Sequence, residues 1–111
     1  MLLVRLAPNL VTSGQIRPAD IPGVAAARFG LLINCRPDDE EPGQPCSSEL
    51  EKAAKQAKLD YRHIPVARGQ VSEAATRAFA DAMAGATGEV LAFCSNGNRP
   101  TALWKAAALL K

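Results

Sequence analysis

The segment LAFCSNGNRP, residues 91–100, decides the fold, because an apolar run there ends in a cysteine and turns through SNGN into an arginine and a proline. It belongs to the most apolar of the expected strands, GEVLAFC at 88–94. From about Asn98 to Leu110 the pattern is helical, and Pro100 stands in the first turn, where a missing N–H costs little. The segment therefore predicts a strand, a tight loop and a helix in succession.

Upstream of this segment, short apolar runs alternate with patterns that favour helices, and turn residues separate them. The expected elements are, in chain order, short strands over 2–6 and 9–12, a helix within 18–28 that Pro22 interrupts or delays, a strand over 30–36, a Pro-rich loop over 37–48, a helix capped by Ser48 with Glu51 at the capping-box spacing, a strand over 61–66, and a helix over 73–85 capped by Ser72.

These elements predict a single three-layer α/β domain over residues 1–111, with a mainly parallel central sheet flanked by helices. Right-handed crossovers place the carboxyl ends of the three main strands at one edge of such a sheet, where ligands bind. The side chains expected at this edge are Asn34, Cys35 and Arg36 after one strand, Arg68 after the next and Cys94 after the third. We therefore expect a pocket that combines a thiol, arginines and backbone amides.

Composition narrows the functional classes. Hydrophobic residues make up 48% of the chain, charged residues 22%, and the net charge is +2, which is typical of a globular domain and does not favour nucleic-acid binding. No apolar run approaches the roughly 20 residues that cross a bilayer, so we expect neither a membrane partner nor a signal peptide. Three cysteines and one histidine at no metal-like spacing predict no metal site and favour a reducing, cytoplasmic location.

The loop between Cys94 and Arg99 has the composition of an anion-binding site. Gly97 permits the positive φ that such loops often need, and asparagines tolerate left-handed geometry better than most residues. A loop of this kind turns successive backbone N–H groups toward one point, beside the positive end of the following helix. The predicted anion-binding residues are Ser95, Asn96, Gly97, Asn98, Arg36 and Arg68.

The same amides would activate the Cys94 thiol as a nucleophile. A free thiol has a pKa of about 8.5, and a helix N-terminus or a nearby guanidinium can lower that pKa to between about 3.5 and 7.5. Arg99 can offer a planar fork of donors to an oxyanion of the substrate. We therefore predict Cys94 and Arg99 as the catalytic pair, against the alternative that Cys94 is a buried structural thiol.

The hexapeptide CSNGNR at 94–99 resembles the active-site loop of cysteine phosphatases and rhodaneses. Over nearly the whole chain, TSGQIRPADI (12–21), INCRPDDEEPGQP (33–45), IPVARGQVSE (64–73) and CSNGNRPTALW (94–104) together resemble the phosphatase-like domain of the beta-lactamase-hydrolase-like proteins. The resemblance implies a fold similar to dual-specificity phosphatases, and an activity as phosphatase or sulfurtransferase without a metal or organic cofactor. It also implies a metallo-hydrolase-like domain or protein as a partner.

Two chemistries suit this loop. Phosphatases of this type look like H-C-x5-R followed by Ser or Thr, with an upstream Asp as general acid. This chain has C-x4-R, Phe93 and Pro100 at the flanking positions, and only Glu73 where the acid is expected. Sulfur transfer needs no acid, because sulfite leaves thiosulfate without protonation, and the shorter loop resembles that of rhodaneses in length.

The preferred prediction is therefore a sulfurtransferase that carries a persulfide on Cys94 and takes a small anion such as thiosulfate or a persulfide. The first alternative is a phosphatase that uses Cys94 and Arg99 on a phosphate ester. The second is a catalytically degenerate module that binds oxyanions or has a regulatory role.

Several other residues have two interpretations. Cys35 could resolve an oxidised Cys94 as a disulfide, or belong to the core. Asn34 could brace the anion loop, as a strand-end Asn does in related phosphatases, or simply pack. The acidic run DDEE at 38–41 is expected to be a solvated loop whose charge could repel anionic proteins. Cys46, in the Pro-rich loop, has no evident role.

Overall fold

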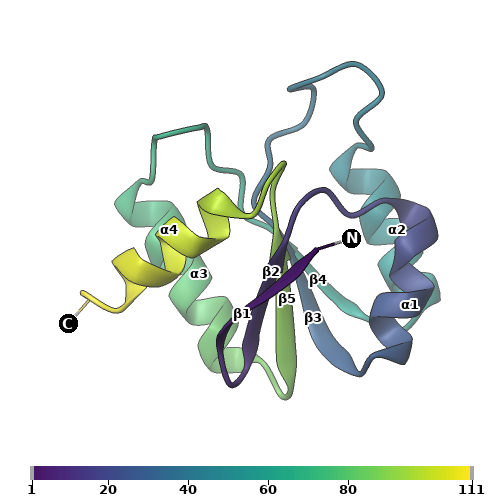
Figure 1. The fold of residues 1–111 in the computed structure, drawn as a ribbon, viewed down its shortest axis with the longest axis horizontal. Helices are drawn as coiled ribbons and strands as arrows, with labels where there is room; N and C mark the ends of the chain where they lie inside the picture. The colour runs from purple at the N-terminus through teal and green to yellow at the C-terminus, as the bar shows by residue number, and fades with distance from the viewer. Residues whose placement is uncertain (1, 111) are drawn as a thin grey trace.

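The computed structural model describes residues 2–110. Its elements alternate between strands and helices along the chain, as Figure 1 shows. They are β1 (Leu3–Ala7), β2 (Leu10–Ser13), the 3-10 helix η1 (Pro18–Asp20), α1 (Ile21–Ala26), β3 (Phe29–Asn34), α2 (Ser47–Gln56), β4 (Asp60–His63), α3 (Glu73–Gly85), β5 (Glu89–Phe93) and α4 (Asn98–Ala107).

The five strands form one sheet in the order β1-β2-β5-β3-β4. Strands β2, β5, β3 and β4 run parallel to one another, and β1 pairs with β2 in the antiparallel direction at the edge of the sheet. Helices α1 and α2 cover one face of the sheet, and α3 and α4 cover the other (Figure 1). The predicted three-layer α/β fold with a mainly parallel sheet is confirmed.

Successive residues of the central strand β5 enter different cores, because side chains alternate across a strand. Val90 and Ala92 pack in the cluster under α3 and α4, which contains Phe79. Leu91 and Phe93 pack in the cluster under α1 and α2. A parallel strand that is covered on both faces is apolar at every position, which explains why the strand is so clear in the sequence.

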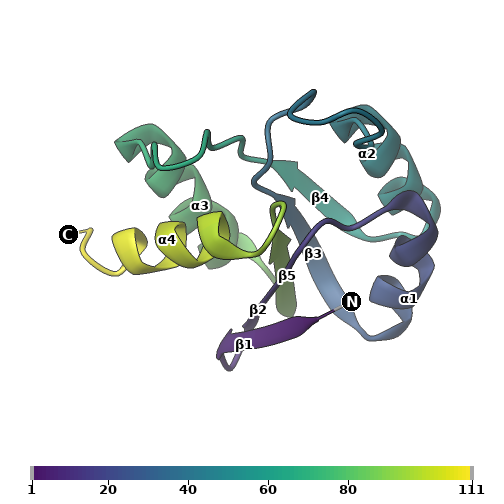
Figure 2. The same cartoon turned by 45° about the horizontal axis from the view of Figure 1, so that its top comes forward.

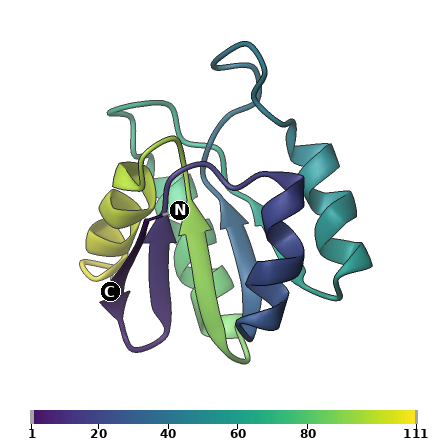
Figure 3. The same cartoon turned by 45° about the vertical axis from the view of Figure 1, so that its right-hand side comes forward.

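The loops that follow β3, β4 and β5 leave the sheet at the same end (Figures 1 and 3). Figure 2, in which that end is turned forward, shows that the loops after β3 and β4 are longer than the loop after β5. Because carboxyl ends of parallel strands meet at one edge, residues far apart in the sequence come together here.

The predicted N-cap of the second long helix is wrong. We expected Ser48, but α2 begins at Ser47 and Cys46 is its N-cap residue. Glu49 accepts a hydrogen bond from the Cys46 backbone N–H at 3.5 Å, and Asp38 accepts one from the Ser47 N–H at 2.8 Å. The start of the helix is therefore set by a carboxylate from the preceding loop, which local spacing does not show.

Other boundaries also differ from the expectation, and β3 ends at Asn34 and not at residue 36. Strand β4 ends at His63 and not at residue 66, although the N–H groups of Ile64 and Val66 still donate to the carbonyls of Asn34 and Cys35. The helix expected within 18–28 is split into η1 and α1, with Pro22 in the first turn of α1. Helix α4 ends at Ala107 and not at residue 110.

A buried leucine of α4 gives a test of how this helix is held. Leu103 is fully buried against the sheet, whereas Leu109 is 81% exposed. We expect Leu103→Ala to lower the free energy of unfolding by about 2–5 kcal/mol, because it leaves a cavity. Leu109→Ala should change it by less than about 0.5 kcal/mol. Urea unfolding followed by circular dichroism measures both, and equal effects would contradict the described packing.

Candidate active site

Cys94 directly follows β5 and is buried at the start of the predicted anion loop. The loop turns at Gly97, whose φ of 86° lies in the left-handed region that glycine adopts without strain. The backbone N–H of Gly97 donates to Cys94 Sγ at 3.2 Å, and the N–H of Arg99 donates to it at 3.5 Å. Both amides therefore converge on the sulfur, as the sequence predicts.

Side chains hold the loop in this shape. Asn96 Oδ1 accepts a hydrogen bond from the Asn98 N–H at 3.0 Å, which closes a tight turn. Thr101 donates its hydroxyl to the Gly97 carbonyl at 2.9 Å. On the other side, a Cβ at Gly14 would lie 3.1 Å from the Ser95 carbonyl, so the segment after β2 packs directly on the loop.

The surroundings of Cys94 favour its thiolate. Burial alone would raise the pKa of the thiol, but the backbone N–H groups of Asn96, Arg99 and Gly97 outweigh burial. Together with the Arg99 guanidinium they bring the pKa of Cys94 below its ordinary value. The loop thus has the geometry of an activated nucleophile.

Arg99 lies in the first turn of α4 and is only 6% exposed. Its Nη1 donates to Glu40 Oε2 at 2.6 Å and to the Val66 carbonyl at 2.9 Å. Its Nη2 donates to Glu40 Oε1 at 2.9 Å and to Ser95 Oγ at 3.1 Å. The guanidinium is therefore fixed by a two-point ion pair and two further hydrogen bonds.

The other two predicted arginines take different places. Arg36 is buried, and its Nε donates to Glu40 Oε1 while its Nη1 donates to Gln15 Oε1, both at 2.8 Å. It therefore lies behind Glu40, and its hydrogen bonds go to residues outside the anion loop. Arg68 is 61% exposed and donates to Ser95 Oγ at 3.2 Å, so it lies at the rim.

A small cavity marks the mouth of the loop. It has a volume of about 170 Å³ and is lined by Arg68, Gly69, Asn96, Asn98 and Arg99. Of the predicted anion-binding residues, the structure thus brings together those of the loop with Arg68. Arg36 contacts Glu40, which in turn contacts Arg99. Anion binding by each of them stays a prediction.

Glu40 is the site residue that sequence reasoning missed. We expected the whole acidic run to be solvated, which is wrong for Glu40, because its side chain is only 18% exposed. Hydrogen bonds from Arg99 and then Arg36 lower its pKa to about 2, against the effect of burial. The contact between Glu40 and Arg99 joins residues 59 positions apart, so no local pattern could have indicated it.

Asn34 braces a neighbouring turn and not the anion loop. Its Oδ1 accepts a hydrogen bond from the Arg36 N–H at 2.9 Å, and its Nδ2 donates to the Tyr61 hydroxyl at 3.0 Å. The Asn34 side chain thus fixes the start of the loop that carries Glu40, and its described hydrogen bonds do not reach the anion loop.

Cys35 lies beside Cys94 at the end of the neighbouring strand. Its backbone N–H donates to the Phe93 carbonyl at 2.8 Å, and its side chain is fully buried. Burial raises the pKa of the Cys35 thiol, and the charge of Cys94 adds to the increase while Arg99 opposes it. Cys35 is therefore protonated at neutral pH, and its role as a resolving thiol stays a prediction.

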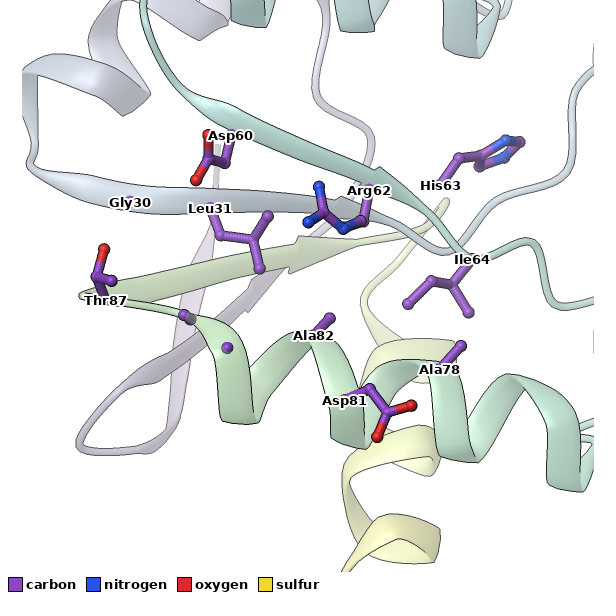
Figure 4. A pocket seen from close by; sticks show the side chains of 12 residues that line it. Gly30, Leu31, Asp60, Arg62, His63, Ile64, Ala78, Asp81, Ala82 and Thr87 are labelled. Atoms are coloured by element: carbon purple, nitrogen blue, oxygen red, sulfur yellow. The ribbon is translucent and has the colours of Figure 1, made fainter.

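A larger cavity lies elsewhere, between β4 and α3, with a volume of about 400 Å³ (Figure 4). Asp60, Arg62 and Asp81 are among the residues that line it, and no residue of the anion loop is. His63 points away from this cavity and places Nε2 2.8 Å from the Arg36 carbonyl. Cavity size therefore does not identify the reactive site here.

Within residues 2–110, no group of three His, Cys, Asp or Glu residues could hold a metal ion. No helix in the same range is long and apolar enough to cross a membrane.

Solved structures of two bacterial proteins have a similar fold. A protein of Neisseria meningitidis, described as a "putative phosphatase", has a TM-score of 0.84 at 29% identity, over 96% of this chain and 78% of that chain. One of Shewanella putrefaciens with the same description has a TM-score of 0.83 at 27% identity, over 96% of this chain and 70% of that one. The predicted likeness to a phosphatase fold is confirmed.

Sequence comparison gives the family. A beta-lactamase hydrolase-like protein of Agrobacterium fabrum is 43% identical over 104 residues, which cover 94% of this chain and 24% of that protein. The chain thus spans about a quarter of the length of this relative. Residues 3–110 match the family described as "Beta-lactamase hydrolase-like protein, phosphatase-like domain". The chain therefore belongs to the phosphatase-like domains of the beta-lactamase hydrolase-like proteins.

Proposed function

We propose that the domain is a sulfurtransferase that carries sulfur as a persulfide on Cys94. The observation that carries this proposal is the pairing of an activated thiol with a carboxylate that cannot act as an acid. Two loop amides donate to Cys94 Sγ, whereas Glu40, which contacts Arg99, has a pKa of about 2. The site thus supplies a nucleophile and an anion cradle, and the reaction must do without proton donation by Glu40.

Sulfur transfer fits these limits. The Cys94 thiolate attacks the outer sulfur of thiosulfate, a new S–S bond forms to Cys94, and the S–S bond of thiosulfate breaks with its electron pair leaving on sulfite. No proton is needed, because sulfite is stable as an anion. A thiolate of an acceptor then attacks the persulfide and restores the Cys94 thiolate. Arg99 and the rim residue Arg68 would bind the sulfonate oxygens.

Phosphate-ester hydrolysis is the second candidate, and the comparisons favour it. The family is described as phosphatase-like, and both similar solved structures are described as "putative phosphatases". In this reaction Cys94 would attack phosphorus, and an alkoxide would leave and take up a proton. The described hydrogen bonds provide no carboxyl group at Cys94, so this route suits an aryl phosphate, whose leaving oxygen is already acidic.

The first prediction separates these candidates. After incubation with thiosulfate, the intact wild-type protein should gain the mass of one sulfur atom, and Cys94→Ser should gain none, because the nucleophile is lost. Cys46→Ser serves as the matched control, since Cys46 lies at the start of α2, outside the anion loop, and this variant should gain sulfur like wild type. Intact-protein mass spectrometry measures all three.

An aryl phosphate assay on the same preparation completes the comparison. Phosphate release that depends on Cys94, without a sulfur adduct, would overturn the proposal in favour of the phosphatase. If the protein shows neither a sulfur adduct nor phosphate release, the result would favour a binding or regulatory module. The metallo-hydrolase-like partner and the cytoplasmic location stay predictions, because these assays use the isolated domain.

The second prediction concerns the thiolate itself. The rate at which iodoacetamide alkylates Cys94 should rise with pH and then level off. The midpoint of this rise should lie below the pKa of roughly 8.5 of a free thiol, because the loop amides stabilise the thiolate. The pH profile of alkylation, followed by peptide mass spectrometry, gives this pKa. A midpoint at or above that of a free thiol would count against sulfur transfer and phosphatase activity alike.

A further inference from the structure

We infer that Glu40 is a positioning residue that fixes the guanidinium of Arg99 beside the anion loop. The inference rests on the proposed role of Arg99 as an anion contact, and it assigns a task to an acidic residue of the loop after β3. Three observations carry it: the pattern of donors on Arg99, the support of Glu40 by its own loop, and the direction of the loop amides.

The donors of Arg99 are nearly all engaged. A guanidinium has five N–H donors. The two on Nη1 go to Glu40 and the Val66 carbonyl, and the two on Nη2 go to Glu40 and Ser95. This leaves Nε–H as the one guanidinium donor of Arg99 without a described acceptor. Glu40 therefore holds both terminal nitrogens of Arg99, and Nε–H is the donor left for an anion.

Glu40 is itself held in place. Its Oε1 also accepts from Arg36 Nε at 2.8 Å, so one carboxylate joins both buried arginines. Its backbone N–H donates to Gln44 Oε1 at 3.1 Å, and Gln44 Nε2 donates to the Pro37 carbonyl at 2.8 Å. The carboxylate is thus part of a braced loop and not the end of a flexible arm, as a positioning role requires.

The opposite role would be that of an internal inhibitor, in which Glu40 occupies the anion cradle until substrate displaces it. The hydrogen bonds argue against this role. The amides of Gly97 and Arg99 donate to Cys94 Sγ, and the acceptors of Glu40 are engaged by side chains of Arg36 and Arg99. Glu40 therefore contacts the outer side of the site, and the cradle formed by the amides is left to the sulfur and its ligand.

The test is protection of Cys94 by a simple oxyanion. Inorganic sulfate or inorganic phosphate should slow alkylation of Cys94 by iodoacetamide at pH 7 in wild type. In Glu40→Gln the concentration that gives half protection should rise about tenfold or more, because Arg99 is no longer held beside the loop. The pH midpoint of Cys94 alkylation should move up if Arg99 is released from the site, whereas loss of the Glu40 charge alone would move it down.

Asp39→Asn is the matched control. Asp39 neighbours Glu40, carries the same charge and is exposed, and its φ of 62° suits asparagine. This variant should keep wild-type protection and pH midpoint. Glu40→Asp, which keeps the charge but shortens its reach, should fall between wild type and Glu40→Gln. If Glu40→Gln is too unstable to assay, the same comparison of Glu40→Asp with wild type decides.

Each other outcome overturns the inference. Tighter protection in Glu40→Gln would mean that Glu40 competes with the anion, and unchanged protection would mean that it acts on stability alone. Absence of protection in wild type by either anion would remove the anion contact that Glu40 is inferred to position. Protection of Cys94 requires no turnover. The protection experiment can therefore be interpreted even if the proposed sulfur transfer is not found.

Discussion

Arg99 brings a positive charge into an almost fully buried position, and the other residues of the site are arranged around this guanidinium. A buried guanidinium is costly unless its charge is paired and its donors are satisfied. Glu40 supplies the charge, and Val66 and Ser95 supply further acceptors. This one requirement joins the ends of three strands, because Glu40 follows β3, Val66 follows β4 and Ser95 follows β5. The pocket edge is therefore held together by the guanidinium that is predicted to bind the substrate anion.

The two cores explain why this arrangement can be rigid. Residues of β5 alternate between the cluster under α3 and α4 and the cluster under α1 and α2, so the strand that carries Cys94 is fixed from both faces. Phe93, where related phosphatases carry a histidine, is part of the second cluster and fully buried. This departure from the phosphatase pattern thus has a packing role, and it removes a polar group that could have supported the thiol.

The parts of the site that sequence predicts are those built by neighbours in the chain. The amides of Gly97 and Arg99 reach Cys94 within five residues, and a glycine and two asparagines are a local signal for such a turn. Glu40 could not be found in the same way, because the acidic run looks equally solvated at every position and only folding selects one member. The same holds for Asp38 at the start of α2, since its partner Ser47 lies nine residues away.

Charge balance distinguishes the two reactions considered for this loop. Arg36 and Arg99 bring two positive charges, Glu40 and an ionised Cys94 bring two negative ones, and the more exposed Glu41 also pairs with Arg36. A persulfide on Cys94 carries the same single charge as the thiolate and leaves this balance intact. A phosphoryl group on the sulfur would carry up to about two negative charges, while Glu40 already neutralises one arginine. The only further cation in contact with the loop side chains that are described is Arg68, at the exposed rim. The proposed persulfide would therefore add no charge to the site, and this is an argument for the proposed sulfur transfer over the phosphatase alternative.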